Sequence, residues 1–572
     1  MHRFTLLSLL FLLISVPPIS AQVPRSVGFN YSTYLGGDLA DIPVAVAYDA
    51  AGNLVVAGYT ASNDFPITNG CIQQTYAGGG FDIFIAKFDP TLGTLLASTF
   101  LGGTGTDILT DMAIDGQNHI LICGRSSSPD FPLSTNAVDT IHGNNQTFVS
   151  KISTNLDSLL ASTMAGPTLS DPEYGHVAIA IDSNNQIIIA LNSQADSFTM
   201  AGPGYQKTFS GGSDGVILKI SSALDQILSS TFYGSPGNDY LFDVALSSDQ
   251  KIYVTGSTNS NSLEITSSAF RDTFSGATDA IVALFSNDLT QLVGSSYYGG
   301  VLFDQAKKIE TDPNGNVYIA GISWSDSLVF GPYSYDYHVN GESDIFILKI
   351  NSLLTGIITG TYVGGSNNEE LAELKIDNTG ALYLGGSTWS DDFPIDTFSF
   401  DTSFTQSYAE GFAIKFTNNL SKLIESSYLG GSLDDEVSSI ALGQPGQLTL
   451  SGWTHSADFP LDGTGYDTLY NHNTDGFLIS TQLDATGIIP AEETINSFMI
   501  DGNYWMVLMA KPGIIEADYY TITGQLVYRQ NFGFYKAGSY RFPLFQSANG
   551  IQLIQAKMGE NIQGLTYGII KP

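Results

Sequence analysis

Positive charge is scarce in this chain of 572 residues. Only 21 Lys and Arg stand against 56 Asp and Glu, which gives a formal net charge of −35 at pH 7. The basic residues are scattered along the sequence, whereas binding to nucleic acid or to an anionic membrane requires a basic surface. We therefore expect no nucleic-acid partner, and we interpret the acidic excess as a solvated surface.

Cysteine and long apolar runs are also nearly absent. Only Cys71 and Cys123 occur, and two cysteines do not make the disulfide framework of a small secreted domain. Cys123 lies in the apolar string HILICG, where we expect it to pack as a small apolar side chain. No segment reaches the roughly 20 apolar residues of a membrane-spanning helix, so we expect no transmembrane segment.

Residues 1–21, MHRFTLLSLLFLLISVPPISA, form a short apolar leader. A basic start is followed by an apolar run from Leu6 to Val16, by Pro17-Pro18 and by the small residues Ser20 and Ala21. This order is typical of a secretory signal peptide, with cleavage near Ala21. A membrane anchor is the alternative, but the apolar run is too short for one. We therefore expect an extracellular or outer cell-surface protein.

Helical patterns are nearly missing, whereas glycine and aromatic residues are plentiful. The chain has 60 Gly, and 12% of its residues are aromatic, which favours many short strands joined by tight turns. A short anchor motif returns at intervals of about 66 residues, the mark of stacked repeats. Its copies are YLGG at 34, FLGG at 100, MAGP at 164, FYGS at 232, YYGG at 297, YVGG at 362 and YLGG at 428.

Each repeat contains four strand-like runs, which we name a, b, c and d. In the first repeat they span 41–49, 52–60, 81–89 and 93–101. Strands b and c are apolar at both alternating sets of positions, so both faces of each small sheet must be covered. Four-stranded sheets that cover one another around an axis form a β-propeller. The sequence therefore predicts an all-β fold with a seven-bladed propeller.

The two ends of the repeat region predict how the ring closes. The seventh c strand, at 475–484, has no d strand after it, whereas residues 27–37 form a d strand with no a, b or c before it. We expect the N-terminal strand to complete blade 7 and to leave no open sheet edge.

These repeats resemble the SBBP family of bacterial β-propeller repeats. The shared pattern joins the YLGG anchor, two Asp residues, a GN turn, a DFP element and a GG-DIF-K segment, over roughly residues 27 to 484. The resemblance is most specific in blades 1, 6 and 7 and weakest in blade 3. It implies a propeller and an extracytoplasmic location, but no defined activity.

The last 85 residues follow a different pattern. Strand-like runs at 517–530, 537–544 and 549–560, with turn signals between them, predict a small β-sandwich. The segment is similar to the C-terminal sorting domain of type IX secretion, although the usual YPNP opening is missing. We thus expect a signal peptide at 1–21, a propeller at 22–487 and a sorting domain at 488–572 whose partner is the type IX machinery.

No catalytic constellation emerges when the repeats are aligned. The G-x-S-x-G string at 211–215 lies before a strand, not in the strand-to-helix turn of a nucleophile elbow. Acids follow each anchor, and we expect them to cap the turn from d to a rather than to bind metal. These acids are Asp41, Asp107, Asp239, Asp304, Glu369 and Asp434.

Lysines recur at one position of strand c. They are Lys87, Lys151, Lys219, Lys349 and Lys415, with Leu284 and Ser480 at that position in the other two blades. A position that accepts Leu favours a packing stem with its charge at the surface over a catalytic base. The histidines show no metal-binding spacing, so we expect no cofactor, no metal site and no catalytic residue.

One register position distinguishes blades 5 to 7. The residue directly after strand b is Trp324, Trp389 or His455 in these blades, whereas blades 1 to 4 have small or polar residues there. A planar ring on the b-to-c loops could stack on a sugar or an aromatic partner, and packing is the alternative role. We therefore expect any glycan or protein ligand at this loop face. The leading hypothesis is noncatalytic binding, adhesion or surface display; the alternatives are a glycan hydrolase or lyase with acids at the axis, and a structural surface-layer component.

Overall fold

The computed structural model describes residues 30–482 apart from 144, 169–174, 196–199, 332–333, 397–399, 406–407, 445–446 and 472. Beyond residue 482 it describes the backbone of seven strands. The chain separates into two compact units, Met1–Leu483 and Asp484–Pro572. The proposed signal peptide lies outside the described residues. Within the described part of the chain, we find no helix long and apolar enough to cross a membrane.

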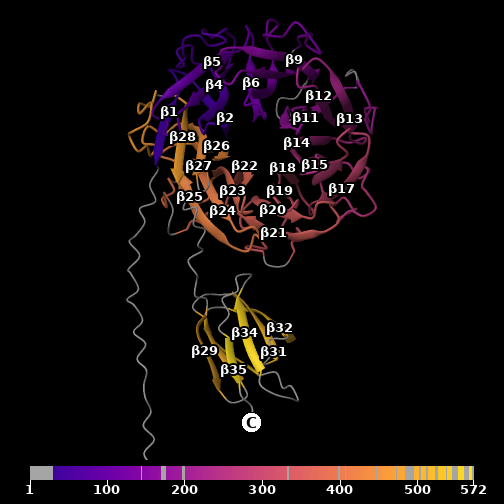
Figure 1. Cartoon of the computed structure of the whole chain (residues 1–572), viewed down its shortest axis with the longest axis vertical. Coiled ribbons are helices and arrows are strands. Elements are labelled where there is room, and N and C mark those ends of the chain that lie inside the picture. The colour runs from indigo at the N-terminus through magenta and orange to yellow at the C-terminus, as the bar shows by residue number, and fades with distance from the viewer. Residues whose placement is uncertain are drawn as a thin grey trace, which may run out of the picture. The chain divides into compact units, whose positions relative to one another are not determined.

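The first unit is a ring of seven antiparallel sheets, each with four strands (Figure 1). In Figure 1 the a strands lie nearest the centre of the ring. Blade 1 consists of β2 (Asp41–Tyr48), β3 (Leu54–Thr60), β4 (Asp82–Phe88) and β5 (Leu95–Leu101). Blade 2 consists of β6 (Asp107–Ile114), β7 (Ile120–Ser126), β8 (Gln146–Ile152) and β9 (Leu159–Thr168). Blade 3 consists of β10 (Ala178–Ile181), β11 (Ile187–Ser193), β12 (Asp214–Ile220) and β13 (Ile227–Tyr233).

The remaining blades repeat this order of strands a, b, c and d. Blade 4 consists of β14 (Asp239–Leu246), β15 (Ile252–Thr258), β16 (Asp279–Phe285) and β17 (Leu292–Tyr298). Blade 5 consists of β18 (Asp304–Thr311), β19 (Val317–Ser323), β20 (Asp344–Ile350) and β21 (Ile357–Val363). Blade 6 consists of β22 (Glu369–Ile376), β23 (Leu382–Thr388), β24 (Glu410–Phe416) and β25 (Leu423–Leu429). Blade 7 consists of β26 (Asp435–Leu442), β27 (Gln447–Thr454), β28 (Asp475–Gln482) and β1 (Tyr31–Leu35).

Apolar packing on both faces of each sheet holds the blades together. Every residue of β4, β12, β16 and β20 is buried. Between blades 1 and 2, for example, Ile83 and Ile85 pack in one cluster with Ile120 and Ile122. The prediction of a seven-bladed propeller is confirmed, and Cys123 packs as expected, fully buried beside Val149.

The N-terminal strand closes the ring as the sequence predicts. Strand β1 pairs antiparallel with β28, with Tyr31 opposite Ser480 and Leu35 opposite Gly476. Side chains strengthen the closure, because Ser32 Oγ donates a hydrogen bond of 2.9 Å to Asp462 Oδ1, 430 residues away in the chain. Blade 7 therefore has the same four strands as the others, although one of them comes from the opposite end of the propeller.

Closure can be tested by a single truncation in β1. Leu35 is fully buried in this strand, whereas Leu39, in the following turn, is 48% exposed. We expect Leu35→Ala to lower the free energy of unfolding by about 2–5 kcal/mol, because it leaves a cavity in the seam. The matched variant Leu39→Ala should change it by less than about 0.5 kcal/mol. Chemical denaturation measures both, and equal effects would contradict the closure.

The recurring lysines of strand c correct one prediction. Their charge was expected at the surface, but Lys87 is 7% exposed and its Nζ lies 2.6 Å from Asp49 Oδ2 in the a-to-b turn. The same Nζ donates to the Thr154 carbonyl of the next blade at 3.2 Å. Equivalent buried pairs are Lys151 with Asp115, Lys219 with Asp182 and Lys349 with Asp312. These lysines thus link neighbouring blades, a role that apolar Leu284 cannot reproduce.

The buried Lys87–Asp49 pair should contribute far more to the free energy of unfolding than an exposed ion pair does. Lys87→Met leaves the Asp49 carboxylate buried without a counter-charge, so we expect a loss of about 3–5 kcal/mol in unfolding free energy. The control is Lys251→Met, because Lys251 pairs with Asp249 at the surface, with side chains 36% and 60% exposed. That variant should cost less than about 1 kcal/mol. A loss of similar size in both variants would refute a buried linking role.

The second unit contains two antiparallel sheets. One has three strands, β29 (Ile495–Asp501), β30 (Tyr504–Met509) and β33 (Gly538–Pro543). The other has four, β31 (Gly513–Thr521), β32 (Leu526–Tyr535), β34 (Gln552–Met558) and β35 (Thr566–Ile569). The resemblance to a sorting domain stays a prediction.

Candidate functional site

The acids that follow the anchors have the capping role that the sequence predicts. Asp41 is fully buried, and its Oδ2 accepts hydrogen bonds from the Gly37 N–H at 2.7 Å and from Ser62 Oγ at 2.8 Å. The same turn contact from an N–H four residues earlier recurs at Asp107, Asp239, Asp304 and Glu369. These side chains hold the d-to-a turn in place at the start of each a strand.

In blade 7 the prediction named the wrong residue of an Asp pair. Asp435, not Asp434, accepts the turn N–H, from Gly431 at 2.7 Å. Asp434 instead accepts the N–H of Ala409 at 2.9 Å. The distance from the anchor decides between them, because Asp435 lies seven residues after Tyr428, as Asp41 does after Tyr34.

The structure places Trp324, Trp389 and His455 at equivalent positions. The backbone N–H of each donates to a carbonyl just before strand a, those of Phe303, Asn368 and Asp434 respectively. Both Trp residues are 38% exposed. In the part of the chain that the structure describes, no ring contact joins these three side chains. Their role in binding a ligand stays a prediction.

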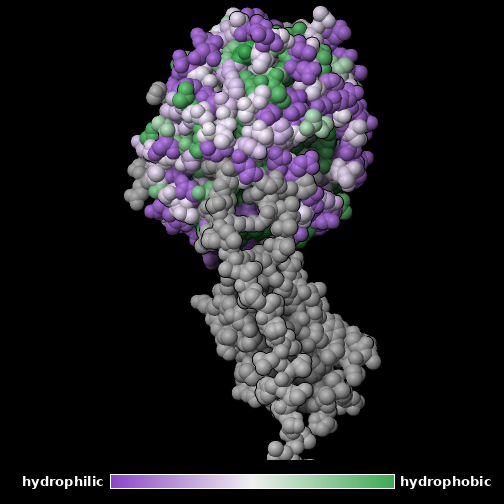
Figure 2. Space-filling view, turned by 60° about the vertical axis from the view of Figure 1, so that its left-hand side comes forward, coloured by the Kyte–Doolittle hydropathy of each residue, from purple (hydrophilic) through white to green (hydrophobic). Residues whose placement is uncertain are grey.

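The local surroundings of the three rings differ. Trp324 packs edge-on against Phe303, with ring centroids 6.4 Å apart. Phe303, which is 52% exposed, lies in an apolar turn beside Val301 and Leu302. These two residues are 68% and 48% exposed, respectively. His455, by contrast, is half-buried, contacts Trp453 and shares a 2.8 Å hydrogen bond with Thr474 Oγ1. In the space-filling view apolar residues form separate patches on a largely polar surface (Figure 2).

A cavity of about 330 Å³ lies among the innermost strands β6, β10, β14, β18 and β22. In these strands a backbone bulge shifts the register in blades 2, 4, 5 and 6, and the residue after the bulge lines the cavity. Those residues are Asp111, Asp243, Lys308 and Glu373. We call this space the axial cavity. Charged side chains from four blades therefore meet near the axis of the ring.

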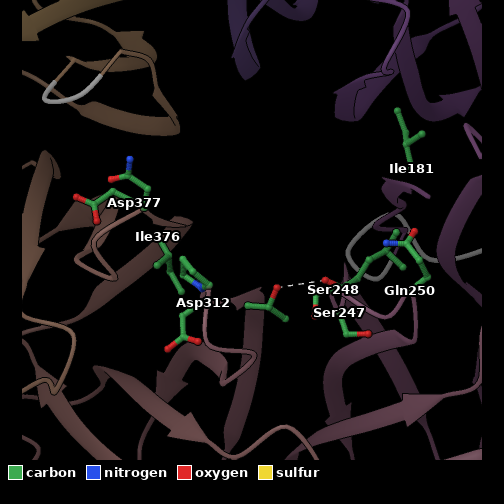
Figure 3. A pocket seen from close by; sticks show the side chains of 11 residues that line it. Ile181, Ser247, Ser248, Gln250, Asp312, Ile376 and Asp377 are labelled. Carbon is green, nitrogen blue, oxygen red and sulfur yellow. Dashed lines mark hydrogen bonds between the residues drawn. The ribbon is translucent and has the colours of Figure 1, made fainter. Parts of the chain in front are cut away.

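The mouth of this region is lined by a-to-b turns. A second hollow of about 370 Å³ shares Ile181, Leu246 and Thr311 with the axial cavity. Figure 3 shows Asp312, Ile376 and Asp377 on one side of it, across open space from Gln250. These turns lie at the opposite end of the strands from the b-to-c loops that contain the Trp residues, because the first residue of strand a pairs with the last of strand b.

Three of the cavity acids are fixed by the backbone. Asp111 accepts N–H groups from Met112 at 2.7 Å and from Ile179 of the next blade at 2.9 Å. Asp243 likewise accepts from Val244 and from Ile309 of the next blade, both at 2.8 Å. Glu373 accepts from the Leu374 N–H at 3.0 Å and from Ser439 Oγ at 3.3 Å. These acids join blades around the axis.

Two lysines and one further acid complete the cluster. Lys375 Nζ lies 3.3 Å from Glu310 Oε1 and 3.4 Å from Glu373 Oε1, while Lys308 Nζ lies 3.6 Å from Glu373 Oε1. Burial opposes ionisation of Lys375, but Glu373 and Glu310 outweigh it and raise the pKa of Lys375. Burial raises the pKa of Glu310. The cluster presents ammonium donors and carboxylate acceptors side by side, with four acids against two lysines.

The sequence contains a signal for this cluster that the motif search missed. At the register of Glu310 and Lys375, the other five blades have Ala47, Ala113, Ala180, Ala245 and Ala441. Two charged residues thus interrupt a small apolar position in neighbouring blades. Within the described residues, no group of three or more His, Cys, Asp or Glu side chains is arranged to hold a metal ion.

Comparison with known proteins adds little to this geometry. No family model and no curated protein matches the chain. A solved protein of unknown function from Dyadobacter fermentans is 9% identical, covering 79% of this chain and 98% of that one, with a TM-score of 0.35. A polysaccharide lyase of family PL25, an ulvan lyase, is 12% identical, covering 74% and 92%, with a TM-score of 0.39.

A third solved structure is PorZ, described as an essential bacterial surface component of the type IX secretion system of Porphyromonas gingivalis. It is 10% identical and covers 95% of this chain and 86% of its own, with a TM-score of 0.19. At such low identity and TM-score, none of these structures carries an argument about function. The resemblance to SBBP repeats also stays a prediction.

Proposed function

We propose that the protein is a secreted or cell-surface propeller that binds a small polyol or the end of a glycan in its axial cavity, without catalysis. The observation that carries the proposal is the charged cluster of Lys308, Glu310 and Lys375 inside a cavity of about 330 Å³. Glu310 and Lys375 replace an alanine that the other five blades share. Binding sites for small molecules are typically concave and contain a few converging polar groups.

The charges favour a hydroxyl-rich ligand over an ionic one. The four carboxylates outnumber the two ammonium groups, so a polyanion such as a sulfated glycan would be repelled. A sugar hydroxyl both donates and accepts hydrogen bonds, and it can therefore bridge Lys375 and Glu310, which lie 3.3 Å apart. A neutral sugar or polyol fits this mixed lining best.

A glycan hydrolase or lyase remains the second candidate, because acids do converge near the axis. Hydrolysis needs two carboxyl groups that are free to act on the substrate. Asp111 and Asp243 instead bind backbone N–H groups through both oxygens. A lyase base must lose its proton near neutral pH, whereas the surrounding carboxylates raise the pKa of Lys375. Both arguments favour binding over catalysis.

The ligand can be sought with the chain that lacks residues 1–21, screened against neutral glycans and polyols and followed by calorimetry. We expect Lys375→Met and Glu310→Gln each to weaken binding about 10- to 100-fold, because each removes a hydrogen bond to a charged group. Asp225→Asn, at an exposed acid in the c-to-d turn of blade 3 that lines neither hollow, is the control and should keep full affinity. Product analysis of the same mixtures distinguishes the candidates: cleavage that is lost in Lys375→Met would favour the enzyme.

The same experiment tests the b-to-c loop face. If Trp324→Ala with Trp389→Ala abolishes binding while Lys375→Met has no effect, the ligand site lies on that face and the axial proposal is wrong. Folding of every variant is checked by its thermal midpoint.

We further propose that the second unit directs export through type IX machinery after a signal peptide has led the chain across the inner membrane. The change of sequence pattern near residue 490 supports this, together with the apolar leader at 1–21. Deleting residues 490–572 should leave the protein in the periplasm of a host with type IX secretion, as measured by fractionation. Unchanged arrival at the cell surface would overturn the proposal.

A further inference from the structure

Two buried acids meet at six of the seven junctions between blades. One is the turn acid that caps the d-to-a turn, and the other is the first residue of strand c in the preceding blade, which we call the c-acid. The pairs, c-acid first, are Asp82 with Asp107, Asp214 with Asp239, Asp279 with Asp304, Asp344 with Glu369, Glu410 with Asp435 and Asp475 with Asp41. Each of these twelve residues is at most 1% exposed.

The backbone places each pair side by side. At the first junction the Asp107 N–H donates to the carbonyl of Phe81, the residue before Asp82, at 2.8 Å. The anchor glycine gives the two carboxyl groups room: a Cβ on Gly102 would lie 2.6 Å from Asp82 Oδ1 and 2.9 Å from Asp107 Oδ2. A Cβ on Gly364 would likewise lie 2.6 Å from Asp344 Oδ1 and 2.5 Å from Glu369 Oε2. Both acids of a pair lie beside the same glycine at four junctions, whereas at Gly234 and Gly299 the nearest atoms all belong to the c-acid.

The two members of a pair are supplied with hydrogen-bond donors unequally. Asp239 accepts the Ser235 N–H at 2.6 Å on Oδ2 and the Thr258 hydroxyl on Oδ1. Asp214 accepts only the Ser210 N–H, at 2.7 Å on Oδ2, and its Oδ1 is buried with no hydrogen-bond partner. An orphaned oxygen occurs in every c-acid: Asp82 Oδ1, Asp214 Oδ1, Asp279 Oδ1, Asp344 Oδ1, Glu410 Oε2 and Asp475 Oδ1. Four turn acids also have one, Asp41 Oδ1, Asp107 Oδ1, Glu369 Oε2 and Asp435 Oδ1, whereas Asp239 and Asp304 accept donors on both oxygens.

The junction between blades 2 and 3 differs from the other six. Gln146 occupies the c-acid position there and is 4% exposed. The d-to-a turn of blade 3 lies outside the described residues. A neutral amide at the c-acid position fits a c-acid that carries no charge.

We propose that each of the six pairs shares one proton. At Asp214–Asp239 and Asp279–Asp304, where the turn acid already accepts donors on both oxygens, the c-acid is the neutral carboxylic acid, and it donates an O–H···O hydrogen bond to the ionised turn acid of the next blade. A proton supplies the donor that the orphaned oxygen lacks, and it removes the repulsion between two desolvated carboxylates. Each shared-proton hydrogen bond crosses a junction, so the six protons link neighbouring blades.

A cation fits the same position less well. Calcium takes six to eight oxygen ligands, whereas at two junctions only one oxygen is without a partner, on Asp214 and on Asp279. The turn acids Asp239 and Asp304 already accept donors on both oxygens. A proton needs only one orphaned oxygen and one acceptor.

The surroundings of the pairs keep the proton bound. Burial, assisted by the neighbouring turn acid, raises the pKa of Asp82, Asp214 and Asp475 to about 7. At the Asp279–Asp304 pair Arg271 opposes this, yet the pKa of Asp279 is also raised to about 7. The other ionisable groups that face the pairs are Asp64, Asp130, Asp336, Asp401, Asp467, Tyr34, Tyr76, Tyr233, Tyr297, Tyr298, Tyr362, Tyr428 and Tyr470.

The proposal sets the direction of the pH dependence. The folded pKa lies above the unfolded value of about 3.9 for Asp, so the fold binds the proton more tightly than the unfolded chain does. The stability from the pairs is therefore fully present below about pH 4 and is lost as the pH rises through about 7. The propeller should loosen as its medium turns from mildly acidic to mildly alkaline.

The decisive experiment compares two amide variants of one pair. In Asp214→Asn the amide N–H₂ replaces the carboxylic O–H as donor, so the thermal midpoint at pH 6 should stay close to that of the unaltered chain and should fall less between pH 6 and 8.5. Asp239→Asn replaces the acceptor, so its midpoint should be lower at every pH. Asp272→Asn, at an exposed acid, is the control. If Asp214→Asn and Asp239→Asn lower the midpoint equally at pH 6, the proposal is wrong.

Proton binding gives an independent readout that does not depend on the stability of a variant. In potentiometric titration at about pH 5.5, the folded unaltered chain should bind about one proton more than folded Asp214→Asn, because Asp214 is then protonated. Equal proton binding by the two chains would overturn the proposal. Added Ca²⁺ should leave the midpoint of the full chain unchanged; a large rise that Asp214→Asn and Asp239→Asn both abolish would instead identify a cation between the acids.

Discussion

The whole structure depends on sheets that are apolar on both faces. A strand such as β16, in which every residue is buried, can be stable only with a neighbour on each side. Each blade therefore needs two others, and a row of blades satisfies this requirement everywhere only when it returns to its beginning. The pairing of β1 with β28 is the consequence. The closed ring and the position of the N-terminal strand both follow from the same demand for burial.

Polar groups at the seams between blades take three different forms. On the side of the a-to-b turns, buried Lys–Asp pairs reach the next blade, as Lys87 does through the Thr154 carbonyl. On the side of the d-to-a turns, pairs of acids lie near the anchor glycines. Near the axis, Asp111 and Asp243 accept backbone N–H groups across the junction. The apolar faces supply most of the cohesion, and these polar contacts fix the angle and register at which the faces meet.

The sequence predicts the fold well because burial of a strand leaves a local pattern of apolar residues in the sequence. The alternation of apolar residues and the spacing of the anchors place the four strands of blade 1 within two or three residues of β2, β3, β4 and β5. Polar contacts between side chains that are distant in sequence leave no such local pattern. Lys87 looks like an amphipathic stem in its own strand, and only the folded ring reveals that Asp49 lies 2.6 Å away in a buried position.

The axial cluster escaped sequence analysis for a related reason. Motif searches look for residues that are close in sequence or that match a known spacing, whereas Lys308, Glu310 and Lys375 come from two strands that meet only at the centre of the ring. The visible trace is that Glu310 and Lys375 replace alanine at a position that is otherwise regular in the repeat, whereas the position of Lys308 varies from blade to blade. In a repeat protein, departures from the repeat are therefore more informative about function than the repeat itself.

The strand that closes the ring also determines when the propeller can be completed during synthesis. Translation delivers β1 first and its partner β28 last among the propeller strands, and the residues of the seam contact Ser32–Asp462 are 430 positions apart. Until the last blade has been made, β1 has no strand to pair with, and the growing row of blades exposes an apolar sheet face at each end. A chain cut short at any earlier blade retains these apolar faces and the unpaired β1, and such a chain is prone to aggregation and proteolysis. The seam thus acts as a check of completeness, since only a full-length propeller can hide both of its ends.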